Sequence, residues 1–276
     1  MLNHKTPVEL PTGYIDFFKD LESWQNQETI KIKNNYTPAQ SDILRKLMQE
    51  RKPLIMTVKP QIEAPALKDV YSRLLDFLLG KRPEIRSELD KLKSAIPGLD
   101  FDEIIMNFIR IRMAYFEELA TAIGVASDLF FFTIDHAIRP FLRVFAETYR
   151  NDLGSNSFHW DFPATCPICG CKSHFSRLKA DNGERFMFCD HCFAEWKVAY
   201  LHCVYCGHDR PGDITYLSVA DDDAFQVYVC SKCKGYLKTY DERGAARMVD
   251  LFIANMETIY LDILATDKGY TNHDED

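Results

Sequence analysis

Cys166-Pro167-Ile168-Cys169-Gly170 and Cys203-Val204-Tyr205-Cys206-Gly207 are two versions of one short motif, and they open the two halves of the stretch that decides the fold. In each motif a tight turn places two thiols on one side. The glycine tolerates the positive φ that lets backbone N–H groups face sulfur. Each half closes on a second CxxC pair, at Cys189/Cys192 and at Cys230/Cys233. The stretch from 166 to 233 therefore looks like a duplicated four-cysteine module.

Each half also carries a predicted hairpin between its two cysteine pairs. In the first half, residues 174–180 and 185–188 flank Asn182-Gly183, and Asn-Gly is the strongest short signal for a β-hairpin. In the second half, residues 214–219 and 225–229 alternate around Asp221-Asp222-Asp223, which we expect to be a solvated hairpin tip. We predict two consecutive ribbons, each closing one tetrahedral four-thiolate site.

Metal binding explains these cysteines better than disulfides, which suit short secreted chains, or a single thioredoxin-like redox pair. A site with four protein ligands is structural and has no open position for catalysis. Four thiolates accept either Zn²⁺ or iron, so we predict two divalent metal ions, zinc or iron. The alternative is a cross-braced arrangement, which pairs the first CxxC with the third and the second with the fourth. The ligand sets that we predict are Cys166, Cys169, Cys189 and Cys192, and Cys203, Cys206, Cys230 and Cys233.

Other side chains near the cysteines are expected to lie outside the metal sites. Cys171 is a ninth thiol that we expect to be reduced and spare, with exchange against Cys169 as the alternative. Trp196 is expected in the core between the two ribbons. Its alternative role is contact with a partner protein, which we also assign to Glu195 and Tyr236. Four histidines are expected on the surface rather than as ligands: His174, His191, His202 and His208.

The first 160 residues contain no cysteine and are predicted to form helices, with an extended connector at Pro53, Pro60 and Pro65. The strongest apolar stripes cover residues 101–123, ended by Gly124, and residues 127–149. The second of these is apolar nearly all round at its start, as in the middle of a bundle, and Pro140 should kink it. Further helices are expected at residues 14–27, 41–51, 68–80 and 83–94.

These patterns together predict an α+β protein. An all-α helical bundle is expected over residues 1–157, followed by two tandem four-cysteine modules of the rubredoxin or zinc-ribbon type at 158–201 and 202–242. A C-terminal helix over 243–270 should pack on the ribbons or on their junction with the bundle, because its apolar face must be buried. An acidic tail follows over 271–276.

The charge balance argues against nucleic acid as a partner. The formal net charge is −8, and acidic residues outnumber basic ones even within 160–245. A phosphate backbone demands a basic face instead. The first residues lack the apolar core of a signal peptide, and the most apolar run, residues 129–134, is too short to span a bilayer. We therefore expect a cytoplasmic protein without membrane insertion.

Several motifs follow one another in a fixed order: Cys189-x-x-Cys192-x-x-Glu195-Trp196, then Cys203-x-x-Cys206-Gly207, then Cys230-x-x-Cys233-x-Gly235-Tyr236-Leu237-Lys238, with 261–265 and 269–270. This order resembles that of the formate dehydrogenase accessory proteins of the FdhE type. The likeness is specific over residues 164–270 and looser over the helical half. The C-terminus departs from the family, whose members often finish with an Asn-Pro-Phe-type tail.

This resemblance implies a non-enzymatic cytoplasmic maturation factor that is needed for active molybdenum- or tungsten-dependent formate dehydrogenase. It implies contact with the catalytic subunit of that enzyme and iron in place of zinc as an option. Self-association of the factor is left open. Two functions from other classes compete with this one: a zinc-ribbon nucleic-acid or transcription accessory protein, and a thiol redox protein.

Overall fold

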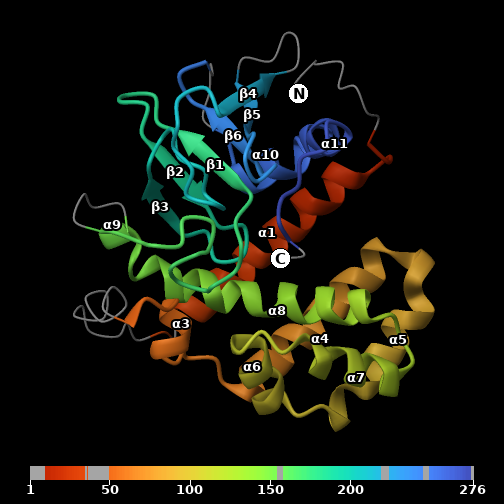
Figure 1. Cartoon of the computed structure of the whole chain (residues 1–276). Coiled ribbons are helices and arrows are strands. Elements are labelled where there is room, and N and C mark those ends of the chain that lie inside the picture. Colours follow the sequence, from red (N-terminus) through yellow and green to blue (C-terminus); the bar gives the residue numbers. More distant parts are fainter. Residues whose placement is uncertain are drawn as a thin grey trace. The chain divides into compact units, whose positions relative to one another are not determined.

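The computed structural model of the chain contains helices and one mixed sheet (Figure 1), as the predicted α+β class requires. The structure describes residues 10–34, 36, 50–153, 158–218, 224–244 and 249–274. The helix expected at 41–51 and the hairpin tip at Asp221–Asp223 lie essentially outside these residues.

The contacts divide the chain into two compact units, which are described separately. Unit 1 takes in Met1–Asp20, Gln40–Leu54 and Ala146–Asp276, and unit 2 takes in Leu21–Ala39 and Ile55–Phe145. The boundary expected at residue 157 falls outside the described residues. Unit 1 differs from the expected ribbon domains because it also includes segments from the N-terminal half.

Unit 2 is helical. Its longest element is α8 (Ser127–Glu147), which continues through Pro140 as one helix, and the expected kink there stays a prediction. The buried face of α8 includes Phe130, Ile134 and Ile138. Most of α1 and α8 belongs to unit 2, together with most of α3. The other bounds are α1 (Tyr14–Lys33), α3 (Leu54–Thr57), α4 (Ala64–Lys81), α5 (Arg86–Ala95), α6 (Phe101–Ile109) and α7 (Met113–Ile123), with 3-10 turns at Pro83–Ile85 and Ile96–Gly98.

Buried polar side chains join α8 to α1 within unit 2. Arg143 donates from Nη2 to Glu22 Oε2 at 2.8 Å and to Gln25 Oε1 at 2.8 Å. The Gln25 amide in turn donates to the backbone oxygen of His136 at 2.9 Å. Charged groups are tolerated in the interior when hydrogen bonds and an opposite charge satisfy them. These contacts explain how a central helix can carry arginine on a buried face.

The single helix predicted over 101–123 is wrong, because the chain breaks it into α6 and α7. Ile111 takes a left-handed conformation with φ of +54°. The Arg112 N–H donates to the Asn107 carbonyl at 3.0 Å, and the Ile111 N–H donates to that of Phe108 at 3.0 Å. These two bonds form a Schellman ending, in which glycine usually occupies the left-handed position. Gly124 ends α7 as predicted, with φ of +78°.

We predict that Ile111→Gly stabilises the protein by up to about 1 kcal/mol, because glycine adopts the left-handed conformation without steric cost. Little packing is lost, since 55% of Ile111 is exposed. The measurement is urea-induced unfolding followed by circular dichroism. Glu118→Gly, at an exposed interior position of α7, is the matched control and should destabilise by about 1 kcal/mol. Equal destabilisation by the two changes would contradict the assigned strain.

Unit 1 is built around a six-stranded sheet with the order β3-β2-β1-β6-β5-β4. Strands β1, β2 and β3 follow one another antiparallel, and so do β4, β5 and β6. The two predicted hairpins are therefore present, but each module adds a third strand that we did not predict. The bounds are β1 (Phe175–Leu178), β2 (Arg185–Phe188), β3 (Glu195–Val198), β4 (Ile214–Ser218), β5 (Phe225–Cys230) and β6 (Tyr236–Asp241).

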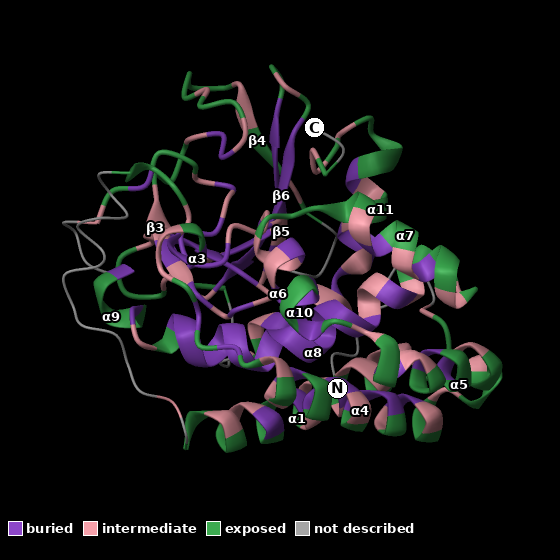
Figure 2. Ribbon diagram, turned by 90° about the horizontal axis from the view of Figure 1, so that it is seen from below, coloured by how far each residue is buried: buried purple, intermediate pink, exposed green. Residues whose placement is uncertain are grey.

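The two modules share one sheet instead of forming separate ribbons. Strand β1 pairs parallel with β6, with Ser176 opposite Thr239. The two hydroxyls lie 2.9 Å apart, so this buried pair satisfies its own polar groups. Every residue of β6 is buried, as befits a strand in the middle of a sheet (Figure 2). Backbone pairing between β1 and β6 thus joins the two duplicated modules into one sheet.

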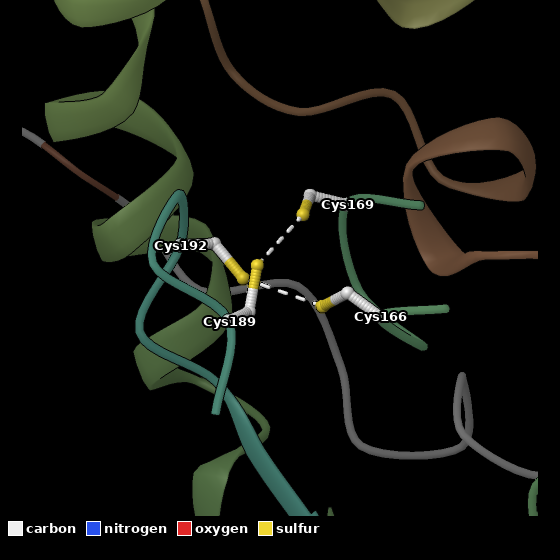
Figure 3. A group of neighbouring side chains, drawn as sticks. All are labelled: Cys166, Cys169, Cys189 and Cys192. Carbon is white, nitrogen blue, oxygen red and sulfur yellow. Dashed lines mark hydrogen bonds between the residues drawn. The ribbon is translucent and has the colours of Figure 1, made fainter. Parts of the chain in front are cut away.

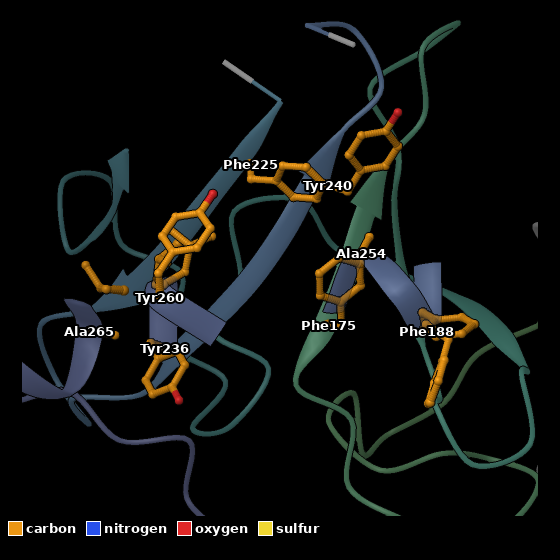
Figure 4. Close-up of a cluster of buried hydrophobic side chains, with 12 residues drawn as sticks. Phe175, Phe188, Phe225, Tyr236, Tyr240, Ala254, Tyr260 and Ala265 are labelled. Carbon is orange, nitrogen blue, oxygen red and sulfur yellow. The ribbon is translucent and has the colours of Figure 1, made fainter. Parts of the chain in front are cut away.

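The predicted C-terminal helix returns to the sheet but is two helices, α10 (Leu251–Glu257) and α11 (Ile259–Asp267), broken at Thr258. Phe252, Tyr260 and Leu261 are buried in one apolar cluster with side chains of β1, β2, β5 and β6 (Figure 4). Phe18, at the N-terminal end of α1, packs against the same cluster. A further short helix of this unit is α9 (Arg150–Leu153).

A buried ion pair fixes α11 to the central strand. Lys238 is 3% exposed and donates from Nζ to Asp262 Oδ2 at 2.7 Å. The Tyr236 hydroxyl donates to the other oxygen of Asp262 at 3.1 Å. Burial lowers the pKa of Lys238, while the Asp262 carboxylate opposes that shift. The family-like motif Gly235-Tyr236-Leu237-Lys238 therefore serves to hold the C-terminal helices on the sheet.

Candidate metal centres

The structure brings eight cysteines into two groups of four, in the sequential arrangement that we expected rather than the cross-braced one. In each group the sulfur atoms all lie within 4.8 Å of one another. Figure 3 shows the four side chains of the first group converging from the two CxxC turns. The groups are Cys166, Cys169, Cys189 and Cys192, and Cys203, Cys206, Cys230 and Cys233.

All four CxxC turns have the same backbone construction. In the turn at Cys203, the Gly207 N–H donates to the Cys203 carbonyl at 2.9 Å, and the Cys203 N–H donates to the His208 carbonyl at 2.8 Å. The equivalent bonds recur at the other three turns. The residue after the second cysteine always has positive φ, which Gly170 and Gly207 were expected to provide. In the second turn of each module, Phe193 and Lys234 take this conformation instead, with φ of 60° and 61°.

Sulfur separations match tetrahedral coordination. The Cys166–Cys192 and Cys169–Cys189 pairs are 3.5 Å apart in the first group. In the second group, Cys203–Cys233 is 3.5 Å and Cys206–Cys230 is 3.9 Å. A tetrahedral ion with metal–sulfur bonds of about 2.3 Å sets its sulfurs about 3.8 Å apart. All of these distances exceed a disulfide bond, and the nine cysteines are free thiols.

Burial of the first group makes four simultaneous thiolates unfavourable without a cation. Burial raises the pKa of Cys192 well above its usual value, and its hydrogen bond with Cys166 adds to the shift. Burial also acts to raise the pKa of Cys189, but hydrogen bonds from the neighbouring thiols outweigh it and hold that pKa well below the usual value. A divalent ion would remove this conflict by neutralising the thiolates. The donor set therefore fits a metal ion such as Zn²⁺ or iron.

The second group is more open to solvent. Cys206 is exposed and Cys233 is half-buried, whereas all four cysteines of the first group are buried. Burial raises the pKa of Cys233 to about 11. Burial would also raise the pKa of Cys230, but hydrogen bonds from the backbone of Cys233 and Lys232 lower it on balance. The backbone of this turn thus favours a thiolate at Cys230 before any metal binds.

Gly235 allows the second group to close. A β-carbon at this position would lie 2.6 Å from the Tyr205 ring and 3.1 Å from the sulfur of Cys233. The Gly235 N–H also donates to Cys233 Sγ at 3.3 Å. Only glycine permits this close approach, which accounts for its place in the motif.

The other predicted neighbours lie outside the two groups. Cys171 belongs to neither, and its hydrogen bond with Cys169 together with the charge of His191 lowers its pKa to about 7. His174 Nε2 lies 2.7 Å from Asp274 Oδ1, and His208 Nε2 lies 2.7 Å from Asp213 Oδ2. The His202 ring lies beside Gly207. The two groups consist of cysteines alone.

The three residues considered for partner contact are held in contacts within unit 1. Trp196 is fully buried, and its indole N–H donates to the Pro163 carbonyl at 3.0 Å. It lies on β3 at the outer edge of the first module, so the expected position between the two ribbons is wrong. Tyr236 is 4% exposed, and Glu195 pairs with Arg177. A partner role for these residues stays a prediction.

We predict that Gly207→Ala destabilises the metal-loaded protein by about 1 kcal/mol, because alanine is strained in the left-handed conformation. Lys234→Gly, at the matching position of the other turn, should stabilise it by up to about 1 kcal/mol. Thermal unfolding of the zinc-loaded variants is the measurement. The two variants should change the stability in opposite directions. Destabilisation by Lys234→Gly would show that the lysine side chain contributes more to stability than the backbone strain costs.

We predict that a chelator removes metal in two phases, with the second group emptied first because its cysteines are more exposed. Zinc release to a coloured chelator measures both rates. Cys206→Ser should abolish the fast phase and Cys169→Ser the slow one. Cys171→Ser is the control and should leave both phases intact. Loss of the slow phase in Cys206→Ser would reverse the assignment.

Comparison with known proteins was made by sequence and by structure. No family model matches the chain. The chain is 26% identical over 150 residues to a protein FdhE homolog of Aquifex aeolicus, covering 53% of the chain and 51% of the relative. It is 25% identical over 196 residues to the homolog of an Enterobacter species, covering 67% and 61%, and 31% identical over 110 residues to that of Haemophilus ducreyi, covering 38% and 35%. The chain thus spans between 35% and 61% of the length of these relatives.

One solved structure has the same fold over nearly the whole chain. The crystal structure of the FdhE protein from Pseudomonas aeruginosa superposes with a TM-score of 0.58 at 16% identity, covering 93% of this chain and 86% of that one. Among the described helices, none is by itself long and apolar enough to cross a membrane. The pair α7 and α8 meets the length and composition criteria only when counted together, across a bend of 115°.

Proposed function

We propose, since the chain belongs to the FdhE family, that it is a non-enzymatic cytoplasmic accessory factor for assembly of molybdenum- or tungsten-dependent formate dehydrogenase. The observation that carries this proposal is the pair of all-cysteine groups. A metal ion held there would have four protein ligands and no open position for a substrate. Metal ions with four protein ligands stabilise the folded modules and do not take part in a reaction.

The partner in this proposal is the catalytic subunit of formate dehydrogenase. Unit 1 offers an exposed aromatic and aliphatic surface near the second cysteine group, made by Tyr200, Leu201 and Tyr216. Tyr200 and Tyr216 belong to one surface, since both rings contact Tyr228, with centroids 6.1 and 5.8 Å away. Exposed apolar side chains gathered in this way are typical of protein-binding sites. Self-association of the factor stays a prediction.

The competing functions have weaker support. A nucleic-acid-binding ribbon would need a basic face, whereas the chain carries a net charge of −8. A thiol redox protein would need an exposed, reactive cysteine pair, whereas the eight paired cysteines converge in groups of four. A gel shift at low salt and alkylation of the metal-loaded protein test these two alternatives.

We predict that Leu201→Glu reduces capture of the formate dehydrogenase catalytic subunit at least about tenfold, because burying an unpaired carboxylate in an interface is costly. A pull-down from the native cell, quantified by mass spectrometry, is the measurement. Ile30→Glu is the matched control at an exposed aliphatic residue of unit 2, where 58% of the side chain is accessible. It should leave capture unchanged.

Metal removal provides a second arm of this experiment. The metal-free protein should also lose capture if the docking surface depends on the folded modules. Undiminished capture by both Leu201→Glu and the metal-free protein would move the docking surface away from unit 1 and overturn this mechanism.

A further inference from the structure

Arg185 is a buried cation without a carboxylate partner. Only 2% of it is exposed. Among the residues that the structure describes, the other buried arginines are Arg139 and Arg143, and both form ion pairs, with Asp135 and Glu22. Arg185 forms none with any described carboxylate. A buried charge is costly unless an opposite charge or hydrogen bonds compensate it.

The surroundings of Arg185 compensate only one edge of its guanidinium group. Nη1 donates to the Ser176 hydroxyl at 3.3 Å and to the Thr239 hydroxyl at 3.1 Å. The guanidinium carbon lies 4.0 Å from the ring centroid of Tyr228 and 5.4 Å from that of Tyr200. Aromatic faces attract a cation without accepting hydrogen bonds in its plane.

The other edge of the group, formed by Nε and Nη2, is buried and without a hydrogen-bond partner. The same two atoms hold carboxylates elsewhere in this chain. In Arg73, Nε and Nη2 donate to the two oxygens of Glu28 at 3.2 and 2.7 Å. In Arg243 they donate to those of Asp241 at 2.9 and 2.8 Å. This edge is the fork that matches a carboxylate bidentately.

Charged groups packed near Arg185 do not take up this fork. Besides Tyr228 and Tyr200, the carboxylate that acts on the charge of Arg185 is that of Asp241. Its two oxygens already accept from Arg243, and one of them also accepts from the Arg243 backbone N–H. The nearby tyrosines are bonded to each other, with the Tyr200 and Tyr228 hydroxyl oxygens 3.1 Å apart. The one hydroxyl hydrogen that this bond leaves free could donate to an incoming anion.

Arg185 lines a narrow pocket that is open to solvent. Tyr200, Tyr228, His202 and Leu237 contribute to its walls, and Cys203 and Cys230 lie beside it. We propose that this pocket binds a carboxylate group, held bidentately by Nε and Nη2 of Arg185. One cation between aromatic rings suits a monoanion. A dianion such as phosphate would bring a second charge that no lysine or second arginine in the lining compensates.

The carboxylate can come from two sources that share this chemistry. One is a small free acid of the size of formate or acetate. The other is the C-terminal carboxylate of a protein chain that docks on the exposed surface formed by Tyr200, Leu201 and Tyr216. The inference does not depend on the accessory role proposed above, because it follows from the pocket alone.

The test is a titration of the metal-loaded full chain followed by NMR of the arginine Nε–H resonances. Formate, acetate, inorganic phosphate, and a short peptide with either a free or an amidated C-terminus are the probes. Formate or acetate should shift the Arg185 resonance saturably. Much tighter binding of the free-acid peptide, with no effect of its amide, assigns the carboxylate to a partner chain. Equal affinity for formate assigns it to a small acid.

Two variants give the matched comparison. Arg185→Lys keeps the charge but loses the fork, and should weaken binding by roughly ten- to a hundredfold in a ligand-observed titration. Arg210→Gln removes an exposed arginine of the second module and should leave binding unchanged. No response of the wild-type Arg185 resonance to any carboxylate overturns the proposal, whether or not the variants fold. Equal binding by Arg185→Lys, or tighter binding of phosphate, also overturns it.

Discussion

Eight thiols packed in two groups impose the constraint on which unit 1 depends. Sulfurs 3.5 Å apart cannot all carry charge in a buried site, yet the turns that hold them point all four inward. A divalent ion satisfies both conditions at once, and its binding free energy becomes folding free energy for strands this short. The strands have between four and six residues each. The CxxC turns precede β3 and β6 directly, so fixing the cysteines also fixes where these strands begin.

The parallel pairing of β1 with β6 joins the two four-cysteine modules into one six-stranded sheet. Its centre is polar, because the hydroxyls of Ser176 and Thr239 face each other and both accept from Arg185 of β2. Arg185 extends across the sheet to Tyr228 of β5, so one side chain contacts strands of both modules. The opposite face is mostly apolar and is covered by α10 and α11, where Lys238 pairs with Asp262. The buried cation on the helix-covered face therefore has a carboxylate partner, whereas Arg185 on the other face has none among the described residues.

Local signals in the sequence predicted the local parts of this structure and failed where distant segments meet. The CxxC turns, the Asn182-Gly183 hairpin and Gly124 depend on a few adjacent residues, and these predictions are confirmed. The parallel β1–β6 pair joins residues more than sixty positions apart. Strand β6 is fully buried, but Lys238 and Thr239 in its middle give its sequence the pattern of a polar segment. Ile111 has a left-handed backbone although it is not a glycine, and the apolar stripe continues through it. The sequence therefore gives no signal for the break between α6 and α7. The role of Arg185 was missed for the same reason, since its neighbours come from three other strands.

The position of β6 makes the two metal groups dependent on each other. Cys233 ends the last CxxC turn, and Tyr236 begins the central strand three residues later. Order at the second group therefore aligns β6, whose parallel pairing aligns β1 beside the first group. The same strand holds α11 through Lys238 and Asp262, so the C-terminal helices rely on the second group as well. Because the second group is the more exposed of the two, a metal ion held there would be the one that solvent reaches first. Loss of that ion would disorder the centre of the sheet rather than its edge, because β6 is paired on both sides, with β1 and with β5.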